Sequence, residues 1–562
     1  MRIVIGGLVL VAASCSGSEA DSTTTAAPVT LPTTTTSLAP AATTTTTIAE
    51  PPPTRAVIEV VGPEEVVFDW TTDQCEPDHI PDIAARAVRD ANGAVQLTIG
   101  HYFNYRMVGP SLDDLTVDCT PVLISDFDPD PAQFNDSVWL GGLYTEDGET
   151  IYAIVHNEYR GDTHGATRPD QCPSNDRFTC LDTSHTLYVS RDGGANYQPV
   201  RPPPGHLVAS LPYVFEDEGR PTGLRQPSNL LSGPDGYVYL FSNVSDYPDE
   251  EQWVCAMRTD DIEDPASWRY WTGTDFTGRF VNPYLTEATG TEKCAPLALP
   301  QLDVSIQESV VYDEVLERFV MIGTSHEPAT GAGWGVYFST SEDLIEWTPR
   351  RLIQELPSYS SVEDPEVDFF YAYASLIDPD SASRTFDTSD GSAYLYITRF
   401  NAGTSSVDRD LVRWPIQTRI VEVERPAWEF DTAGDTEGWS PLNNADGFTT
   451  SGGSLVMEST GDDLHFGTAV SIPAQFDRIS IRMRVTGGAP DDIGQLFFGT
   501  EARPDYTEEA SIVFPIDADG EVHEYTLTLS DNPLWEGTII SLRLDPGTQP
   551  GQVVEIDRIW FP

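Results

Sequence analysis

Short apolar runs alternate with turns rich in Gly, Asp, Pro and Asn between about residues 56 and 424, without a long helical period. Five runs are especially apolar, and each is flanked by a weaker strand signal before it and a strand ending in an acidic turn after it. Because a four-stranded blade needs neighbours on both sides, five such units predict a five-bladed β-propeller. The five runs are AVQLTIGHYF (94–103), TIYAIVHNEY (150–159), YVYLFSNVS (237–245), RFVMIGTSH (318–326) and AYLYITRFN (393–401).

The C-terminal part has a different pattern, in which apolar and polar residues alternate over short strands. Examples are ISIRMRV (479–485) and the closing VVEIDRIWF (553–561). Alternation without a helical period predicts two packed antiparallel sheets. We therefore expect an all-β protein, with the propeller in residues 56–425 and a jelly-roll-like β-sandwich in residues 426–562.

The N-terminus has the pattern of an export signal. The apolar run Ile3–Val11 is too short to span a membrane, and it is followed by Ala-Ala-Ser before Cys15. Residues 1–15 resemble a bacterial lipoprotein signal in which Cys15 is lipidated, although Ala12 stands where such signals usually carry leucine. An ordinary secretory signal is the alternative. Residues 16–55 are almost all Thr, Ser, Ala and Pro, which predicts a disordered stalk.

The cysteine count agrees with export. The chain has 7 Cys, and lipidation of Cys15 leaves six, which allow 15 connectivities. We expect disulfides in sequential order, and the absence of a CxxC pair gives no support for a zinc or redox motif. The expected pairs are Cys75–Cys119, Cys172–Cys180 and Cys255–Cys294.

The charge excludes some partners. There are 89 Asp and Glu residues against 31 Lys and Arg, a formal net charge of -58, and Lys293 is the only lysine. Such a surface repels nucleic acid and anionic lipid. We expect no nucleic-acid partner, membrane contact only through the N-terminal lipid anchor, a monomer, and a location at the cell surface, lipid-anchored or secreted.

Two turns connect the chain with known enzymes. SRDGGANY (190–197) matches the Asp-box S-x-D-x-G-x-x-W with Tyr197 in place of tryptophan, and SEDLIEW (341–347) occupies the matching place in a later blade. Residues 75–420 resemble the five-bladed glycoside hydrolases of families 43 and 32. The C-terminal part resembles carbohydrate-binding sandwich modules, a resemblance that implies a structural Ca²⁺ held by Asp431 and Asp557.

The family 43 resemblance implies three catalytic acids on the first strands of blades one to three. Asp82 and Asp136 match the first two. The third position, Pro227-Ser228-Asn229, has no acid, so Glu308 or Glu158 would have to replace it. Paired carboxyl groups, one protonated and one ionised, are the requirement of glycosidic hydrolysis, and we expect no catalytic cofactor.

The second strands of four blades end in a basic side chain, which predicts a ligand-binding rim. In VHNEYRGDTHG (155–165), His156 and Glu158 lie two residues apart and hence on one face of a strand. A transition-metal site of His156, Glu158, Asp162 and His164 is the alternative there, but the stretch has no H-x-x-x-H spacing. The expected substrate-binding residues are His101, Trp139, His156, Arg160, Asn229, His326, Tyr373 and Arg399.

The sequence therefore predicts an extracellular glycan-processing protein, with a glycoside hydrolase favoured. The alternatives are a non-catalytic surface glycan-binding lipoprotein, an adhesion or protein-interaction propeller, and a sialidase-like hydrolase. A sialidase would bind a carboxylate with several arginines, for which Arg160, Arg225, Arg399 and Arg409 are available, and Tyr373 would be its nucleophile. An enzyme requires Glu308 or Glu158 to face Asp82 or Asp136.

Overall fold

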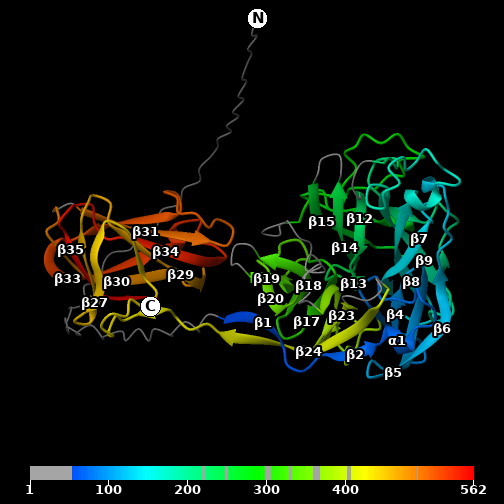
Figure 1. Cartoon of the computed structure of the whole chain (residues 1–562), viewed down its shortest axis with the longest axis horizontal. Helices are drawn as coiled ribbons and strands as arrows, with labels where there is room; N and C mark the ends of the chain where they lie inside the picture. Colours follow the sequence, from blue (N-terminus) through cyan, green and yellow to red (C-terminus); the bar gives the residue numbers. More distant parts are fainter. Residues whose placement is uncertain are drawn as a thin grey trace, which may run out of the picture. The chain divides into compact units, whose positions relative to one another are not determined.

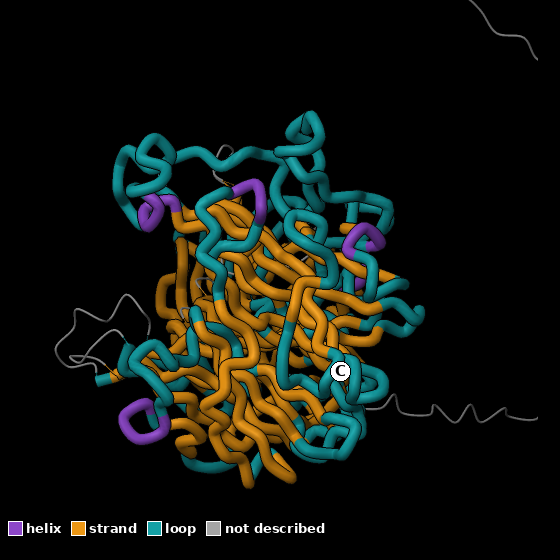
Figure 2. Tube along the Cα trace, turned by 90° about the vertical axis from the view of Figure 1, so that its right-hand side faces the viewer, coloured by secondary structure: helices purple, strands orange, loops and turns teal. Residues whose placement is uncertain are grey.

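The computed structural model describes residues 54–217, 222–246, 251–297, 306–327, 332–357, 368–401, 407–489 and 492–562. The regular elements there are β-strands, apart from the four-residue helix α1 (Trp70–Asp73) and short 3-10 turns (Figures 1 and 2). The predicted all-β class is confirmed. No helix in this part of the chain has the length and apolar character needed to cross a membrane. The predicted signal, Cys15 and nearly all of the stalk lie outside the described residues.

The strands of residues 54–422 form five successive antiparallel groups. The first group is one four-stranded sheet, and the second and third groups join into one ten-stranded sheet because Gly223 pairs with Thr183 in parallel. The first group contains β3 (Arg86–Arg89), β4 (Val95–Gly100), β5 (Phe103–Ser111) and β6 (Asp114–Ile124). The second contains β7 (Ser137–Tyr144), β8 (Ile151–Arg160), β9 (Leu181–Ser190), β10 (Gln198–Pro199) and β11 (Leu207–Ala209). The third contains β12 (Thr222–Pro227), β13 (Leu231–Ser232), β14 (Val238–Asp246), β15 (Glu251–Thr259) and β16 (Arg269–Tyr270).

The last two groups are separate sheets, and the chain's first strand belongs to the last of them. Thr54 pairs with Glu422, so that β1 lies beside β24 and joins the start of this region to its end. The fourth group contains β17 (Ser309–Asp313), β18 (Arg318–Glu327), β19 (Ala332–Ser341) and β20 (Arg351–Glu355), with β22 (Thr388–Ser389) beside β17. The fifth contains β21 (Phe369–Ile377), β23 (Ser392–Asn401), β24 (Arg409–Glu422), β1 (Thr54–Val60) and β2 (Glu65–Phe68).

The five apolar runs of the sequence coincide with β4, β8, β14, β18 and β23, each of which pairs with the first strand given for its group. All nine residues of β14 are buried, and so are nine of the ten residues of β8. A strand that is buried on both faces needs apolar side chains at consecutive positions, which explains why these runs do not alternate.

Arg86 joins the five groups at their centre. Its guanidinium donates to the carbonyls of Gly141 at 2.6 Å, Pro227 at 3.0 Å and Glu308 at 2.7 Å, and to the Ser375 hydroxyl at 2.6 Å. These four acceptors come from the four other groups. Burial lowers the pKa of Arg86 to about 9, against the opposing charge of Glu308, so the side chain remains a cation at neutral pH.

The two acidic turns that suggested a propeller have structural roles. Asp192 and Asp343 each accept two backbone N–H groups within their own turns, at 2.9 to 3.1 Å. The aromatic residues that end the turns, Tyr197 and Trp347, are buried. Both turns are therefore fold elements rather than catalytic groups.

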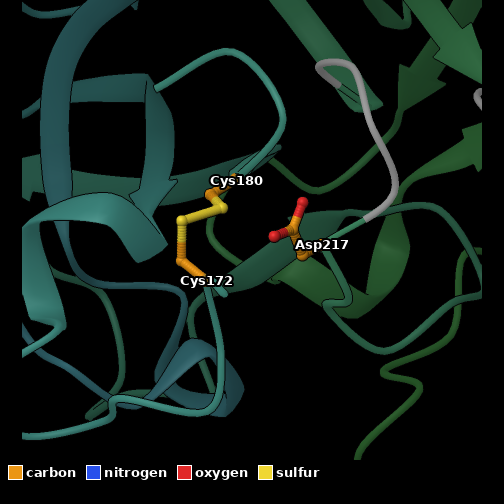
Figure 3. Close-up of side chains that lie close together, drawn as sticks. All are labelled: Cys172, Cys180 and Asp217. Carbon is orange, nitrogen blue, oxygen red and sulfur yellow. A yellow bond between two sulfur atoms is a disulfide. The ribbon is translucent and has the colours of Figure 1, made fainter. Parts of the chain in front are cut away.

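The three expected disulfides are present: Cys75–Cys119, Cys172–Cys180 and Cys255–Cys294. Asp217 lies beside the second of them (Figure 3), where its carboxylate accepts the Ser174 N–H at 2.9 Å. Because both sulfurs are bonded to each other, this group of side chains has no thiolate with which to hold a metal ion.

Residues 427–562 form two further antiparallel sheets. Their inward side chains share one apolar core, which includes Leu455, Ile481, Phe498 and Leu542. One sheet contains β25 (Ala427–Trp428), β27 (Ala445–Ser451), β28 (Ser454–Ser459), β30 (Arg478–Thr486), β33 (Asp519–Thr528) and β35 (Val553–Trp560). The other contains β26 (Ser440–Asn443), β29 (His465–Pro473), β31 (Asp492–Thr500), β32 (Ser511–Ile516) and β34 (Thr538–Asp545).

Candidate functional site

Asp82 lies just before β3 and is held by three side chains from distant parts of the chain. One carboxylate oxygen contacts the Arg409 guanidinium and accepts the Tyr373 hydroxyl at 3.3 Å. The other lies 3.6 Å from His101 Nε2. The side chain of Asp82 is 14% exposed. Its carboxylate is therefore fixed in position without being closed off from solvent.

Tyr373 reaches Asp82 from an irregular point in β21. The pairing of β21 with β23 shifts register between Ala372 and Ser375, and Tyr373 has a φ of 70°. A bulky residue in this left-handed region costs about 1–3 kcal/mol, a strain that is typical of functional sites. The pKa of the Tyr373 hydroxyl is raised by burial and by the charge of Asp82, so it remains a proton donor to the carboxylate.

Glu158, at the end of β8, has the same kind of neighbour as Asp82. Its carboxylate lies 3.3 Å from His156 Nε2, which confirms that these two side chains share one face of the strand. Burial alone would raise the pKa of Glu158. The hydrogen bond from His156 and the nearby charges of His156, Arg160 and Arg225 outweigh burial and lower it. Glu158 is thus ionised near neutral pH in the free protein.

Trp139 lies between the two acid–histidine pairs. Its ring centroid is 5.8 Å from that of His101 and 5.8 Å from that of His156. Asp82, His101, Trp139, His156 and Glu158 therefore form one continuous group, which we call the acid–histidine cluster. Both carboxylates influence the pKa of His101, which burial lowers against their opposing charges. Both acids thus lie close enough to His101 for their charges to act on it.

Glu308 binds the backbone at the irregular point in β21, next to Tyr373. Its carboxyl group accepts the Ala374 N–H at 2.7 Å, the Thr324 N–H at 3.2 Å and the Thr324 hydroxyl at 2.9 Å. Burial raises the pKa of Glu308 to about 7, against these hydrogen bonds and the charge of Arg86. Ala374 directly follows Tyr373, so Glu308 stabilises the backbone that directs Tyr373 toward Asp82.

Asp136 occupies a separate, closed environment. It is 1% exposed, and one carboxylate oxygen accepts the Arg160 N–H at 2.7 Å and lies 2.8 Å from His164 Nε2. Burial raises the pKa of Asp136, while those two hydrogen bonds oppose the shift. Its contacts fix the loop after β8, and within the described residues its carboxylate contacts neither Asp82 nor Glu158.

The side chain of Asn229 has a structural role. Its amide donates to the Val310 carbonyl at 2.7 Å and accepts the Val310 N–H at 2.7 Å. Asn104 joins the first and second groups in the same manner, through Val138 and Leu140 at 2.9 Å. Asn229 therefore fastens the third group to the fourth, and its amide is not available for the predicted substrate contact.

Three of the four arginines that a sialidase would need are paired with acids. The bonds are Arg160 to Asp162 at 3.2 Å, Arg399 to Asp410 at 2.7 Å and also to Glu64, and Arg409 to Asp82. Arg399, a predicted substrate-binding residue, is thus held within the fifth group. The side chain of His326 lies outside the described residues, and its predicted role stays a prediction.

The sequence did not single out two residues beside the cluster. The Tyr102 ring packs against His101 at a tilt of 38°, with centroids 3.8 Å apart, and its hydroxyl accepts a hydrogen bond from Arg160 at 3.3 Å. Arg409, which the sequence offered as a sialidase arginine and as part of an ion-paired segment (408–410), is the partner of Asp82. Tyr102 directly follows His101, which the sequence did single out. The pairing of Arg409 with Asp82 spans 327 residues and leaves no local signal in the sequence.

The calcium prediction is not favoured by the contacts of its two acids. Asp431 is exposed, and the Asp557 carboxylate lies 3.3 Å from Arg482 Nε, so a cation would have to displace that ion pair. Another group of possible ligands, Asp463, His465 and Asp545, contains Arg543 bound to Asp545 at 2.6 Å. The site at Asp431 and Asp557 stays a prediction.

No family model and no curated protein matches the chain. Among solved structures, an exo-β-1,3-galactanase from Phanerochaete chrysosporium with galactose has a TM-score of 0.34 and 10% identity, covering 90% of this chain and 100% of its own. A family 43 protein from Bacillus licheniformis has a TM-score of 0.32 and 10% identity, covering 88% and 99%. An endo-arabinase from Bacteroides thetaiotaomicron has a TM-score of 0.34 and 11% identity, covering 62% and 97%. At these scores, function has to be argued from the site.

Proposed function

We propose that the protein is an extracellular glycoside hydrolase whose reaction takes place at the acid–histidine cluster. The observation that carries this proposal is the pairing of Asp82 with His101 and of Glu158 with His156, on either side of Trp139. Two carboxyl groups near one substrate are the minimum requirement for acid–base hydrolysis of a glycosidic bond. The structural neighbours that are glycoside hydrolases agree with this class.

The two acids differ in their surroundings, and that difference suggests their roles. Asp82 is held by the Arg409 cation and by the Tyr373 hydroxyl, which suits a carboxylate that activates water. Glu158 has no arginine within ion-pair distance in the described residues. Burial is the largest single influence on its pKa and acts to raise it, although the opposing charges now outweigh it. A bound sugar that removes the remaining water would strengthen that influence and raise the pKa. Glu158 would then protonate the glycosidic oxygen.

A non-catalytic glycan-binding protein is the second candidate. The observation in its favour is that the pKa of Glu158 is lowered in the free protein, which is the wrong direction for a general acid. In that case the same acids and histidines would bind sugar hydroxyls without turnover.

Turnover of aryl glycosides and polysaccharides by the full-length protein separates the two candidates. We expect Asp82→Asn and Glu158→Gln each to reduce kcat by at least 10²-fold, the usual contribution of a general acid or base. Asp505→Asn, at an exposed site in the C-terminal region, is the control and should leave turnover unchanged. Undiminished turnover in Glu158→Gln would refute the assignment. Sugar binding without turnover by the unmodified protein would favour the second candidate.

We also infer the wider setting of the site. The five strand groups around Arg86 support a five-bladed propeller, and the two C-terminal sheets around one core support a sandwich that would hold polysaccharide. Export as a monomer, with lipid on Cys15 and the Thr-rich stalk as a spacer, rests on the sequence alone. Mass spectrometry of the mature N-terminus tests the anchor, because an unmodified N-terminus downstream of Cys15 would contradict it.

A further inference from the structure

Arg225 differs from the other arginines near the acid–histidine cluster. No described residue places a carboxylate oxygen within 4.0 Å of its guanidinium, whereas Arg160, Arg399 and Arg409 each have at least one such partner. The protein has 89 acidic residues and 31 basic ones, so an arginine without a paired acid is unexpected. The fold itself therefore gives no reason for a cation at this position.

Arg225 lies in β12, near the Glu158 end of the acid–histidine cluster. Its carbonyl accepts the Ser242 hydroxyl at 3.0 Å, which fixes its backbone against β14. Two residues earlier, Gly223 pairs with Thr183, and Thr183 pairs with Glu158 on the other side of β9. The pairing of β12, β9 and β8 thus brings Arg225 close to Glu158.

Electrostatic effects agree with this placement. The charges of Glu158 and Arg225 each influence the pKa of the other group, and Tyr373 also acts on Arg225. Burial lowers the pKa of Arg225, and the charge of Glu158 only partly opposes this. The guanidinium is therefore partly desolvated and close to both Glu158 and Tyr373, yet it is not ion-paired with the acid.

We propose that Arg225 binds the carboxylate of an acidic sugar, so that glycans containing uronic acids are the substrate class of this site. The proposal rests on the proposed glycan function. The planar guanidinium offers two parallel N–H donors that match a carboxylate, and such bidentate pairs are stronger than hydrogen bonds to neutral hydroxyls. Arg160, Arg399 and Arg409 are already bound to acids, which leaves Arg225 of the four arginines that a sialidase would use.

Binding of matched sugar pairs tests this proposal. Isothermal titration calorimetry of the full-length protein would compare methyl β-D-glucuronide with methyl β-D-glucoside, and methyl β-D-galacturonide with methyl β-D-galactoside. We expect the acidic member of at least one pair to bind roughly tenfold more tightly. Arg225→Gln should abolish this preference and Arg225→Lys should keep part of it. Arg191→Gln, an exposed arginine in the Asp-box turn, should leave it unchanged.

Equal binding within both pairs, no binding of any of the four sugars, or a preference that survives Arg225→Gln would each overturn the proposal. Because this assay needs no turnover, it is separate from the test of hydrolysis. A protein that prefers the uronide but cleaves no glycoside would refute the hydrolase and retain the role of Arg225. If the protein cleaved neutral glycosides and Arg225→Gln did not affect this, the hydrolase would be retained and the role of Arg225 refuted.

Discussion

Glu308→Gln should remove a large part of the pH dependence of stability. Burial raises the pKa of Glu308 from 4.5 to about 7. Each unit of pKa shift corresponds to 1.36 kcal/mol, so the difference between the folded and unfolded chains amounts to about 3 kcal/mol. Because the folded-state pKa is the higher one, this stabilisation is complete below pH 4.5 and is lost as the pH rises through 7.

A glutamine fits the hydrogen bonds at this position. The Ala374 and Thr324 N–H groups share one carboxyl oxygen, which an amide oxygen can replace, and the amide NH₂ can donate to the Thr324 hydroxyl. Glu308→Gln therefore mimics the protonated acid at every pH. At pH 4.5 we expect the variant and the unmodified protein to have nearly the same free energy of unfolding. At pH 8 we expect that of the variant to be about 3 kcal/mol higher.

Urea unfolding between pH 4.5 and 8 measures both curves. Glu308→Ala, which leaves the Ala374 and Thr324 donors without an acceptor, is the matched control and should be destabilised at all pH values. If Glu308→Gln lost stability by the same amount at pH 4.5 and pH 8, the carboxyl group would be ionised throughout, and the role assigned to its burial would be wrong. An unchanged slope with pH would refute the reasoning in the same way.

Three further predictions concern the links between the strand groups, each measured by urea unfolding. Arg86→Leu leaves four acceptors without their donor and should lower the free energy of unfolding by at least about 4 kcal/mol. A loss below about 1 kcal/mol would show that the strand groups do not depend on this side chain. Asn229→Ala should cost about 2 kcal/mol through its two bonds to Val310 and should not alter sugar affinity; a change in affinity alone would restore its predicted role in binding. Replacing both Cys75 and Cys119 by Ala should cost about 4 kcal/mol, since the bond closes a 44-residue separation, and an unchanged midpoint would contradict this entropic argument.

The local features of this protein were predictable from sequence because they depend on neighbouring residues. Strands buried on both faces require consecutive apolar residues, and turns such as Ser190–Tyr197 are closed by their own aspartate, so both leave a readable pattern. The order of the disulfides followed from a simple rule of proximity along the chain. By contrast, the four partners of Arg86 lie in four other groups and have no signature in the sequence.

The choice among the acids could not be made from sequence, because it depends on what faces each carboxyl group. Asp136 and Glu308 both occupy positions on inner strands that suggest catalysis, yet Asp136 is bonded to Arg160 and His164, and Glu308 holds the backbone beside Tyr373. Glu158 lies on a second strand rather than on the first strand of its group. Nevertheless, Glu158 pairs with His156, and the His156 ring contacts Trp139, whose ring also contacts His101, the histidine beside Asp82.

Tyr373 illustrates the same limit in the backbone. Its φ of 70° arises because β21 has one residue more than its partner β23 between Ala372 and Ser375, and Glu308 accepts the N–H that this irregularity exposes. Nothing in the sequence FFYAYASLI marks this point, since it contains no Gly or Pro and is rich in aromatic residues that favour a regular strand. The strain is maintained by a carboxyl group that is itself costly to bury. Two unfavourable features that stabilise each other beside Asp82 are better explained by a demand for a positioned hydroxyl than by stability, which is why we place the reaction there.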